Sequence, residues 1–251
     1  MSARGHAKSQ RRGDIVAAAR ALMQRSGDLG FTMRTLAEDA GVSIATPYNL
    51  FGSKQAILLA VLDADLADYE RALAALQADE IEVLFEAVTL MNAVLAREPD
   101  FYRGVLVAVF RDGGPEFRHM VSGPRYLLWK KLLRQATQAG LLAADFDPDA
   151  FAISLSQLLF SNILDWAHGA LSIEELRARA HYGLALALLA AATPRSREHV
   201  LAQLHRAEGS LQQLWRTALR RRLSDGALDD ESRKLFADQL KHIQPPQEVS
   251  A

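Results

Sequence analysis

The sequence of 251 residues predicts an all-α protein. Apolar residues recur at helical spacing along most of the chain, and no stretch shows sustained alternation of apolar and polar residues between turn dipeptides. Glycines and prolines fall mainly between these periodic stretches, where they end one helix or begin the next. We therefore expect a series of amphipathic helices and no sheet.

The first predicted helix covers residues 10–26. Its apolar residues, from Ile15 to Met23, share one helical face, and Gly27 ends the helix. Residues 1–9 are expected to form a disordered basic arm, which either reaches DNA phosphates or stays solvated.

Residues 31–54 have the pattern of a helix-turn-helix. Thr32 is a candidate N-cap for one short helix, and Gly41 is suited to the left-handed conformation that ends it. Ser43 is the next candidate N-cap, and Ser53 is expected to cap a third helix. Two short helices joined by a corner that contains glycine form this motif.

Pro47 restricts where the second short helix begins. If Ser43 is the N-cap, Pro47 is the fourth helical residue, and its absent N–H removes the first intrahelical hydrogen bond. The alternatives are a later start, with Thr46 as the cap and Pro47 in first position, or a loose opening turn. In either alternative, the outward-facing residues near Pro47 lie at the edge of the helix rather than in its middle.

The second short helix presents small and hydrogen-bonding side chains suited to a DNA major groove. Asn49 can pair bidentately with adenine, and Thr46 can contact a thymine methyl group or a phosphate. The expected base-reading residues are Ile44, Ala45, Thr46 and Asn49. The expected phosphate-binding residues are Thr32, Thr35, Tyr48 and Lys54. Lys54 lies at a helix N-terminus, where free N–H groups, the helix dipole and the ammonium act together on a phosphate.

The stretch FTMRTLAEDAGVSIATPYNLFGSKQAILLAVL resembles the DNA-binding domain of TetR-family transcriptional regulators. It matches the pattern T-x-x-x-[IL]-A-x-x-A-G-V-S-x-x-T-x-Y-x-x-F-x-S-K nearly without gaps over roughly 45 residues. It departs from that pattern at Pro47, where Leu is commoner, and at Ala45, which is often Gly. The resemblance implies a homodimer with a helical ligand-binding domain.

A long helix over residues 54–76 is expected to connect this head to a second domain. Further helices are predicted over residues 80–96, 101–110, 125–139, 147–168 and 172–192. Pro124 is expected to open the helix of residues 125–139. We divide the chain into a DNA-binding domain with a basic arm (1–53), a ligand-binding and dimerisation domain (54–194) and a C-terminal helical extension (195–251).

The family resemblance implies a small, often apolar ligand between the middle helices. An apolar cavity with a few polar groups suits such a ligand. The candidate pocket residues are Phe85, Met91, Phe101, Tyr102, Phe110, Phe117, His119, Met120, Trp129, Gln157 and Trp166. Each aromatic side chain among them also fits a role in the hydrophobic core.

The helices over residues 147–168 and 172–192 are apolar on more than one face, which favours burial against a second copy of the chain. They resemble the helix pair that joins two subunits in the TetR family. The expected interface residues are Phe151, Leu155, Leu159, Leu184 and Leu188. Two recognition helices on a palindrome need a dimer independently of that resemblance.

Residues 195–251 extend beyond the usual end of a TetR-family chain. Helices are predicted over 195–223 and 229–243, and residues 195–222 carry seven Arg against two Glu, a net charge of +5. Packing on the core or dimer and a second contact with DNA or a partner are both consistent with this pattern.

Charge and composition fit a DNA-binding protein. Residues 1–62 carry eight Lys and Arg against four Asp and Glu, a net charge of +4 in a chain of net charge -1. A basic head suits phosphate binding. The absence of cysteine and of a signal peptide or membrane-spanning run favours a cytoplasmic protein without membrane contact.

No catalytic, cofactor or metal-binding motif is apparent, so we expect neither an enzyme nor a bound cofactor. The predicted function is that of a homodimeric repressor, which binds a palindromic operator in double-stranded DNA and is released by a small apolar effector. The alternatives are a ligand-independent regulator or activator, and a helical adaptor whose head has lost its affinity for DNA.

Overall fold

A computed structural model of the chain describes residues 3–26, 30–112, 114–224 and 229–243. Over these residues the chain is all-α, as predicted, and its nearest approach to a sheet is an isolated β-bridge between Leu142 and Ala192. The helices are α1 (Ala3–Ser26), α2 (Met33–Asp39), α3 (Ala45–Phe51), α4 (Lys54–Ala74), α5 (Glu80–Arg97), α6 (Pro99–Asp112), α7 (Pro115–Gln138), α8 (Pro148–Ala167), α9 (Ile173–Ala191), α10 (Arg197–Leu223) and α11 (Asp230–His242).

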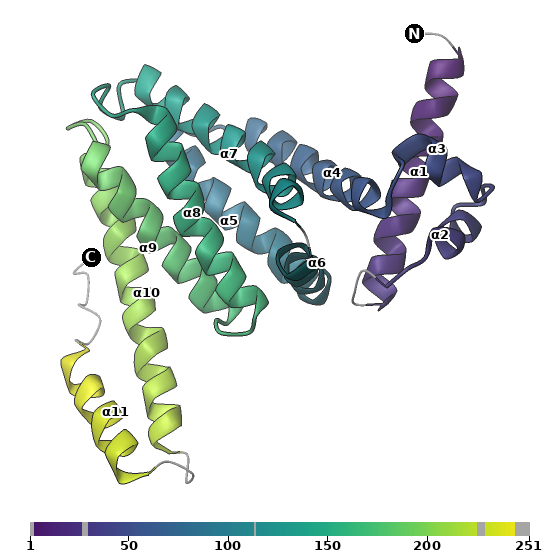
Figure 1. Cartoon of the computed structure of the whole chain (residues 1–251). Helices are drawn as coiled ribbons and strands as arrows, with labels where there is room; N and C mark the ends of the chain where they lie inside the picture. The colour runs from purple at the N-terminus through teal and green to yellow at the C-terminus, as the bar shows by residue number, and fades with distance from the viewer. Residues whose placement is uncertain (1–2, 27–29, 113, 225–228, 244–251) are drawn as a thin grey trace.

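The helices form three regions (Figure 1). We call α1–α3 the head, α4–α9 the body, and α10 with α11 the extension. Helix α4 runs from the head into the body, and α10 lies along α9. The far end of α10 and the whole of α11 project from the body at the corner away from the head.

Short-range sequence signals set several helix ends. Thr32 and Thr35 form a capping box at α2, Ser172 and Glu175 form another at α9, and the Ser53 hydroxyl accepts from the Ala56 N–H at α4. These caps satisfy N–H groups that have no partner inside the helix. The caps predicted at Thr32 and Ser53 are confirmed.

Two predicted boundaries are wrong. Helix α1 begins at Ala3, so the expected disordered arm of residues 1–9 is helical from that point. Ala, Arg, Lys and Gln in this stretch favour a helix, and no residue interrupts it. Helix α7 begins at Pro115 and contains Pro124 in its interior, so Pro124 does not open a helix. Proline removes only its own N–H from the helix, and packing on both sides of it holds the two halves together.

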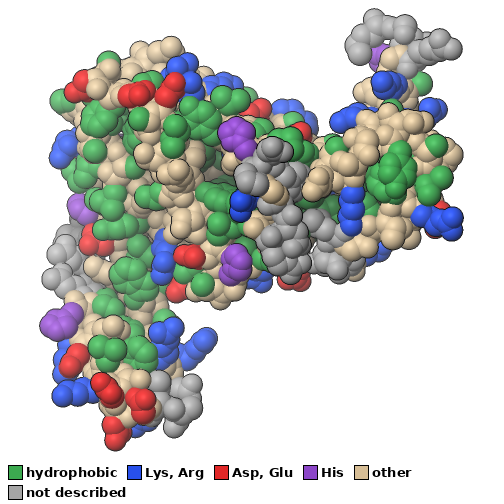
Figure 2. Space-filling model, in the orientation of Figure 1, with side chains coloured by type: hydrophobic (Ala, Val, Ile, Leu, Met, Phe, Trp, Pro, Cys, Tyr) green, Lys and Arg blue, Asp and Glu red, His purple; other side chains and the backbone are tan. Residues whose placement is uncertain are grey.

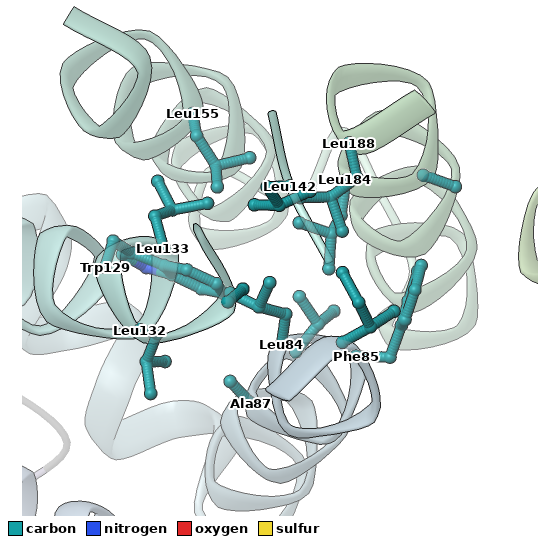
Figure 3. Packing of buried hydrophobic residues seen from close by; sticks show 14 of the residues in the cluster. Leu84, Phe85, Ala87, Trp129, Leu132, Leu133, Leu142, Leu155, Leu184 and Leu188 are labelled. Carbon is teal, nitrogen blue, oxygen red and sulfur yellow. The ribbon is translucent and has the colours of Figure 1, made fainter. Parts of the chain in front are cut away.

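The body has one hydrophobic core, built from α5, α7, α8 and α9 (Figure 3). Leu155, Leu184 and Leu188 point into this core, and each is at most 1 % exposed. Leu159 is also buried, and Phe151 is partly buried against the same core. Four of the five expected interface residues therefore pack within a single chain, because the leucine-rich faces of α8 and α9 point toward α5 and α7. The same two helices expose Ile153, Leu158 and Leu186 instead.

A second core joins the head to the body. It contains Ile15 of α1, Leu36 of α2 and Ile57 of α4 together with Val105 of α6 and Trp166 near the end of α8. The head is therefore packed against α6 as well as connected through α4.

The extension is attached through its first half. Ser196 donates to the Leu141 carbonyl oxygen at 2.5 Å, and Val200 is completely buried. His199 lies 2.8 Å from Glu82 of α5. These contacts place the first half of α10 on the core, which is one of the two roles that the sequence left open for residues 195–251. Helix α11 packs on α10, where Arg222 lies over the Phe236 ring at 5.4 Å.

Candidate DNA-binding surface and ligand cavity

Helix α3 presents the residues expected to read bases. Ile44 is 49 % exposed, Ala45 and Asn49 are exposed, and Thr46 is half-buried. Pro47 is buried beneath them. The visible face of the head carries Lys and Arg side chains and very few Asp or Glu side chains (Figure 2). The geometry and charge of this surface suit an approach to DNA.

The start of α3 explains why Pro47 is tolerated. The helix begins at Ala45, so Pro47 is its third residue, and an N–H at that position would have no partner inside the helix. Ser43 does not cap the helix. Its hydroxyl lies 2.9 Å from the Thr46 hydroxyl, and its carbonyl accepts from the Thr46 N–H at 2.9 Å. A tight turn of the backbone therefore replaces the expected side-chain cap.

Of the residues expected to bind phosphate, three lie at helix starts and Tyr48 lies within α3. Thr32 and Thr35 are exposed at the start of α2, with their hydroxyl oxygens 2.6 Å apart. Tyr48 is 51 % exposed on α3. Lys54 begins α4, and its ammonium lies 4.5 Å from the centre of the Phe31 ring. That ring holds the ammonium at the N-terminus of α4, where an anion is favoured.

Arg12 of α1 supports α3 from behind. Its guanidinium donates to the Leu50 carbonyl oxygen at 2.9 Å and lies 4.1 Å from the centre of the Phe51 ring. Lys8 and Arg11 on the same helix are exposed. Of the basic residues near the N-terminus, Arg12 therefore holds the end of α3 in place, and Lys8 and Arg11 extend the positive surface.

A polar cluster connects the head to the body. We call it the Arg20 cluster, and it consists of Arg20 (α1), Asp65 (α4), Glu98 (between α5 and α6) and Tyr102 (α6). Arg20 forms ion pairs with Asp65 and, at 2.7 Å, with Glu98. The Tyr102 hydroxyl donates to Asp65 at 3.0 Å. Burial by itself would lower the pKa of Arg20, but hydrogen bonds to Asp65 and Tyr102 outweigh it and raise that pKa.

A cavity of about 180 Å³ lies between α4, α5, α6, α7 and α8. Its wall is mainly apolar, with Leu66, Val105 and Leu159 among the lining residues. Asp65 and Tyr102 of the Arg20 cluster also line it, as does Arg125 of α7. Burial raises the pKa of Tyr102 to about 12, so its hydroxyl stays protonated at neutral pH.

The cavity brings together three of the residues expected to bind a ligand: Met91, Tyr102 and Trp129. Phe85 is stacked between His181 and His199 in the core, and Phe101 and Trp166 are buried in the head-to-body core. Phe110 contacts the cavity residue Phe160, with ring centres 4.8 Å apart, but does not itself line the cavity. His119, Met120 and Gln157 are exposed, and the Phe117 side chain lies outside the described residues.

The sequence analysis missed Arg125, Asp65 and Ser156, which also line the cavity. A signal was present for Arg125, because it shares a helical face with the apolar residues Val121, Leu128 and Trp129. A charged residue inside an apolar stripe needs a partner or a function.

A larger hollow of about 1000 Å³ lies between α9 and α10. Charged residues of both signs line it, including Glu174, Arg177, Arg206 and Arg221. Its wall is polar and open, so the hollow is a groove between the two helices rather than a closed cavity. Among the described residues, no cluster suited to hold a metal ion occurs, and no helix is apolar and long enough to cross a membrane.

The exposed α3, the basic head and the mainly apolar cavity together make a helix-turn-helix head joined to a helical body that contains a cavity. Residues 15–61 match the family of bacterial regulatory proteins named tetR. This match spans most of the head and the start of α4, and it shows that this part of the chain is similar to TetR-family regulators.

Solved structures have a similar fold. The chain is 26 % identical to FadR of Thermus thermophilus, a TetR-family transcriptional repressor in complex with lauroyl-CoA, with a TM-score of 0.60. That match covers 70 % of this chain and 93 % of FadR. The chain is 19 % identical to SmeT, the repressor of the Stenotrophomonas maltophilia multidrug efflux pump SmeDEF, with a TM-score of 0.56 over 73 % of this chain and 91 % of SmeT. No curated protein sequence matches the chain.

Proposed function

We propose that this protein is a homodimeric repressor that binds a palindromic operator and leaves it when a small apolar ligand occupies the body cavity. The proposed units are the DNA-binding domain 1–53, the ligand-binding and dimerisation domain 54–194 and the extension 195–251. The observation that carries the proposal is that Asp65 and Tyr102 belong both to the cavity wall and to the Arg20 cluster.

DNA recognition is assigned to α3. Ile44, Ala45, Thr46 and Asn49 would read bases, and Thr32, Thr35, Tyr48 and Lys54 would set register on phosphates. The exposure of Ile44, Ala45, Asn49 and Tyr48 supports this assignment.

Dimerisation is assigned to the outer faces of α8 and α9. Ile153, Leu158 and Leu186 are 47 %, 39 % and 46 % exposed, and hydrophobic side chains recur over this part of the body (Figure 2). Exposed apolar side chains grouped on two adjacent helices suit burial against a second copy. A two-fold dimer would place its two α3 helices about one DNA turn apart.

Release is assigned to the contact between cavity and head. A ligand that displaces Tyr102 or Asp65 would change the hydrogen bonds of Arg20, which holds α1 against α4 and α6. The ligand releases DNA only if it binds the DNA-incompatible arrangement more tightly. The apolar cavity wall supports an apolar ligand, as does the lauroyl-CoA bound to FadR.

The test is selection of fragmented genomic DNA by the purified protein at two salt concentrations, followed by binding to the enriched sequence with and without lauroyl-CoA. Enrichment of one palindrome that survives the higher salt, and its release by the acyl thioester, are expected. Asn49→Ala should relax base preference by about 1–3 kcal/mol. Lys54→Ala should weaken binding to all sequences and reduce the salt slope by about one.

The other outcomes identify other functions. Binding to the palindrome that no apolar ligand weakens would indicate a ligand-independent regulator or an activator. Absence of salt-sensitive binding would indicate a helical adaptor with a degenerate head. Equal behaviour of Asn49→Ala and Lys54→Ala would contradict the assigned roles of these two residues.

A further inference from the structure

Arg125 is a cation in a mainly apolar cavity. It lies directly after Pro124 in α7 and lines the cavity beside Leu128 and Trp129. Its guanidinium donates to the Val121 carbonyl oxygen at 2.5 Å. Among the side chains that the structure describes, no carboxylate pairs with it.

Asp65, the acidic side chain in the cavity wall, already forms an ion pair with Arg20. It also accepts from the Tyr102 hydroxyl. Burial lowers the pKa of Arg125, and the charges of Asp63, Asp65 and Tyr102 oppose that shift only in part. An arginine nevertheless remains protonated in a protein. The cavity therefore holds a positive charge that its own wall does not neutralise.

One polar atom in the cavity wall has no hydrogen-bond partner. The Ser156 hydroxyl oxygen of α8 is buried without a hydrogen bond, and Ser156 lines the same cavity. Buried polar groups are normally satisfied, so a group without a partner in a cavity indicates a ligand atom that completes it. A hydroxyl and a guanidinium both donate hydrogen bonds to an oxyanion.

We infer that the ligand of this cavity is an anionic amphiphile, with a carboxylate bound by Arg125 and an aliphatic tail against the leucines and valines of the wall. This inference rests on the proposed ligand-binding role of the cavity and adds the charge of the ligand to it. The volume of about 180 Å³ is below the range typical of drug-sized sites, so a short aliphatic acid fits inside and a longer chain extends through the opening. The anion neutralises Arg125, which the apolar tail alone does not.

The test compares three ligands of one chain length and different charge. Octanoate, octanamide and octylamine are titrated by calorimetry into the full-length protein without DNA. Octanoate should bind about tenfold or more tightly than octanamide, because a charge-assisted hydrogen bond replaces a neutral one. Octylamine should bind more weakly than octanamide, since its ammonium meets a positive charge.

Two variants assign the effect to Arg125. Arg125→Met should remove the preference for octanoate over octanamide, and Arg125→Lys should retain most of it. Helical content and thermal unfolding of both variants check that they are folded. The wild-type comparison needs no variant, so the inference remains testable if either substitution prevents folding.

Equal affinity of wild type for octanoate and octanamide, or no octanoate binding at millimolar concentration, would overturn the inference. Retention of the full preference in folded Arg125→Met would also overturn it. Failure of the inference can be distinguished from failure of the proposed function. If octanoate binds in a charge-dependent way but does not release DNA, only the proposal of ligand-controlled repression is contradicted. If an uncharged ligand binds equally well and releases DNA, only the inference of an anionic ligand is contradicted.

Discussion

The body cavity shares a wall with the contact between head and body. Each of the two regions contains an arginine, but the two arginines have opposite environments. Arg20 is bound by two carboxylates and also donates to the Tyr102 hydroxyl. Arg125 donates to one carbonyl oxygen, that of Val121. The first arrangement satisfies the guanidinium and ties three helices together, whereas the second leaves donors available to something that the chain does not supply. A buried charge with partners holds a structure together, and one without partners indicates a binding site.

His181 provides a third case. It stacks on Phe85 in the body core, and burial, followed by the charges of Arg177 and Arg206, lowers its pKa to about 4. Because burial and the nearby arginines disfavour its charged form, the imidazole is neutral at neutral pH. An arginine does not have this option because its pKa is far higher. Arg125 therefore needs a partner where His181 does not.

The largest effect is expected for Arg20→Met. This change leaves Asp65 and Glu98 without their cation and should lower the free energy of unfolding by about 2–3 kcal/mol. Urea unfolding measures it. Arg25→Met is a matched control, because Arg25 pairs with Asp39 at an exposed site, where about 1 kcal/mol or less is expected. Equal losses in the two variants would show that the Arg20 cluster is no stronger than a surface ion pair.

The next effect is a pH dependence caused by His181. Its folded pKa of about 4 is below the ordinary value of 6.5, so the unfolded chain binds the proton first as the pH falls. The stability due to neutral His181 is complete above pH 6.5 and is lost progressively toward pH 4, by on the order of 2 kcal/mol. His181→Gln should reduce the loss of unfolding free energy between pH 8 and pH 5. An unchanged loss would place the titration in other groups.

Tyr102→Phe tests the wall that the two regions share. It removes the hydroxyl that donates to Asp65 at 3.0 Å and should lower the free energy of unfolding by about 1 kcal/mol. It should also alter ligand-dependent release of DNA, because that hydroxyl joins the cavity to the Arg20 cluster. The measurement pairs thermal unfolding with DNA binding in the presence of lauroyl-CoA. Tyr69→Phe is the control, because its hydroxyl also lies by the cavity but donates to the Ala87 carbonyl oxygen at 2.5 Å.

The smallest effect on the free energy of unfolding is expected for Arg125→Met in the absence of ligand, and its sign is opposite to that of the other substitutions. Replacing an unpaired buried charge by an apolar side chain of similar length should leave stability unchanged or raise it by up to about 1 kcal/mol. Differential scanning calorimetry of the ligand-free protein measures it. A loss as large as that of Arg20→Met would mean that Arg125 has a structural partner and would remove the contrast between the two arginines.

Several helix ends were predictable because their signals are local. The caps at Thr32, Ser53 and Ser172 and the left-handed Gly41 each depend on a few neighbouring residues. The start of α3 was less certain, because Pro47 is compatible with several cap positions. The structure resolves this by placing Pro47 third in the helix, where its missing N–H has no consequence.

The expected interface and pocket residues show the limit of pattern reasoning. The leucines of α8 and α9 were correctly recognised as apolar, but which faces pack against α5 and α7 depends on the arrangement of four helices. Leu184 and Leu188 accordingly entered the monomer core, and Leu186 was left outside. Likewise, Phe85, Phe101 and Trp166 were recognised as large apolar residues, but only tertiary packing separates a core position from a cavity wall.

The sequence by itself determined the all-α class, most helix boundaries and the helix-turn-helix, because these follow from spacing and from caps within a few residues. An almost continuous stretch of the head also carries the resemblance to the TetR family. Only the tertiary structure decided that Arg20 finds Asp65 and Glu98 while Arg125 does not. Their partners are contributed by helices distant in sequence, and no local pattern specifies which charges meet once those helices pack.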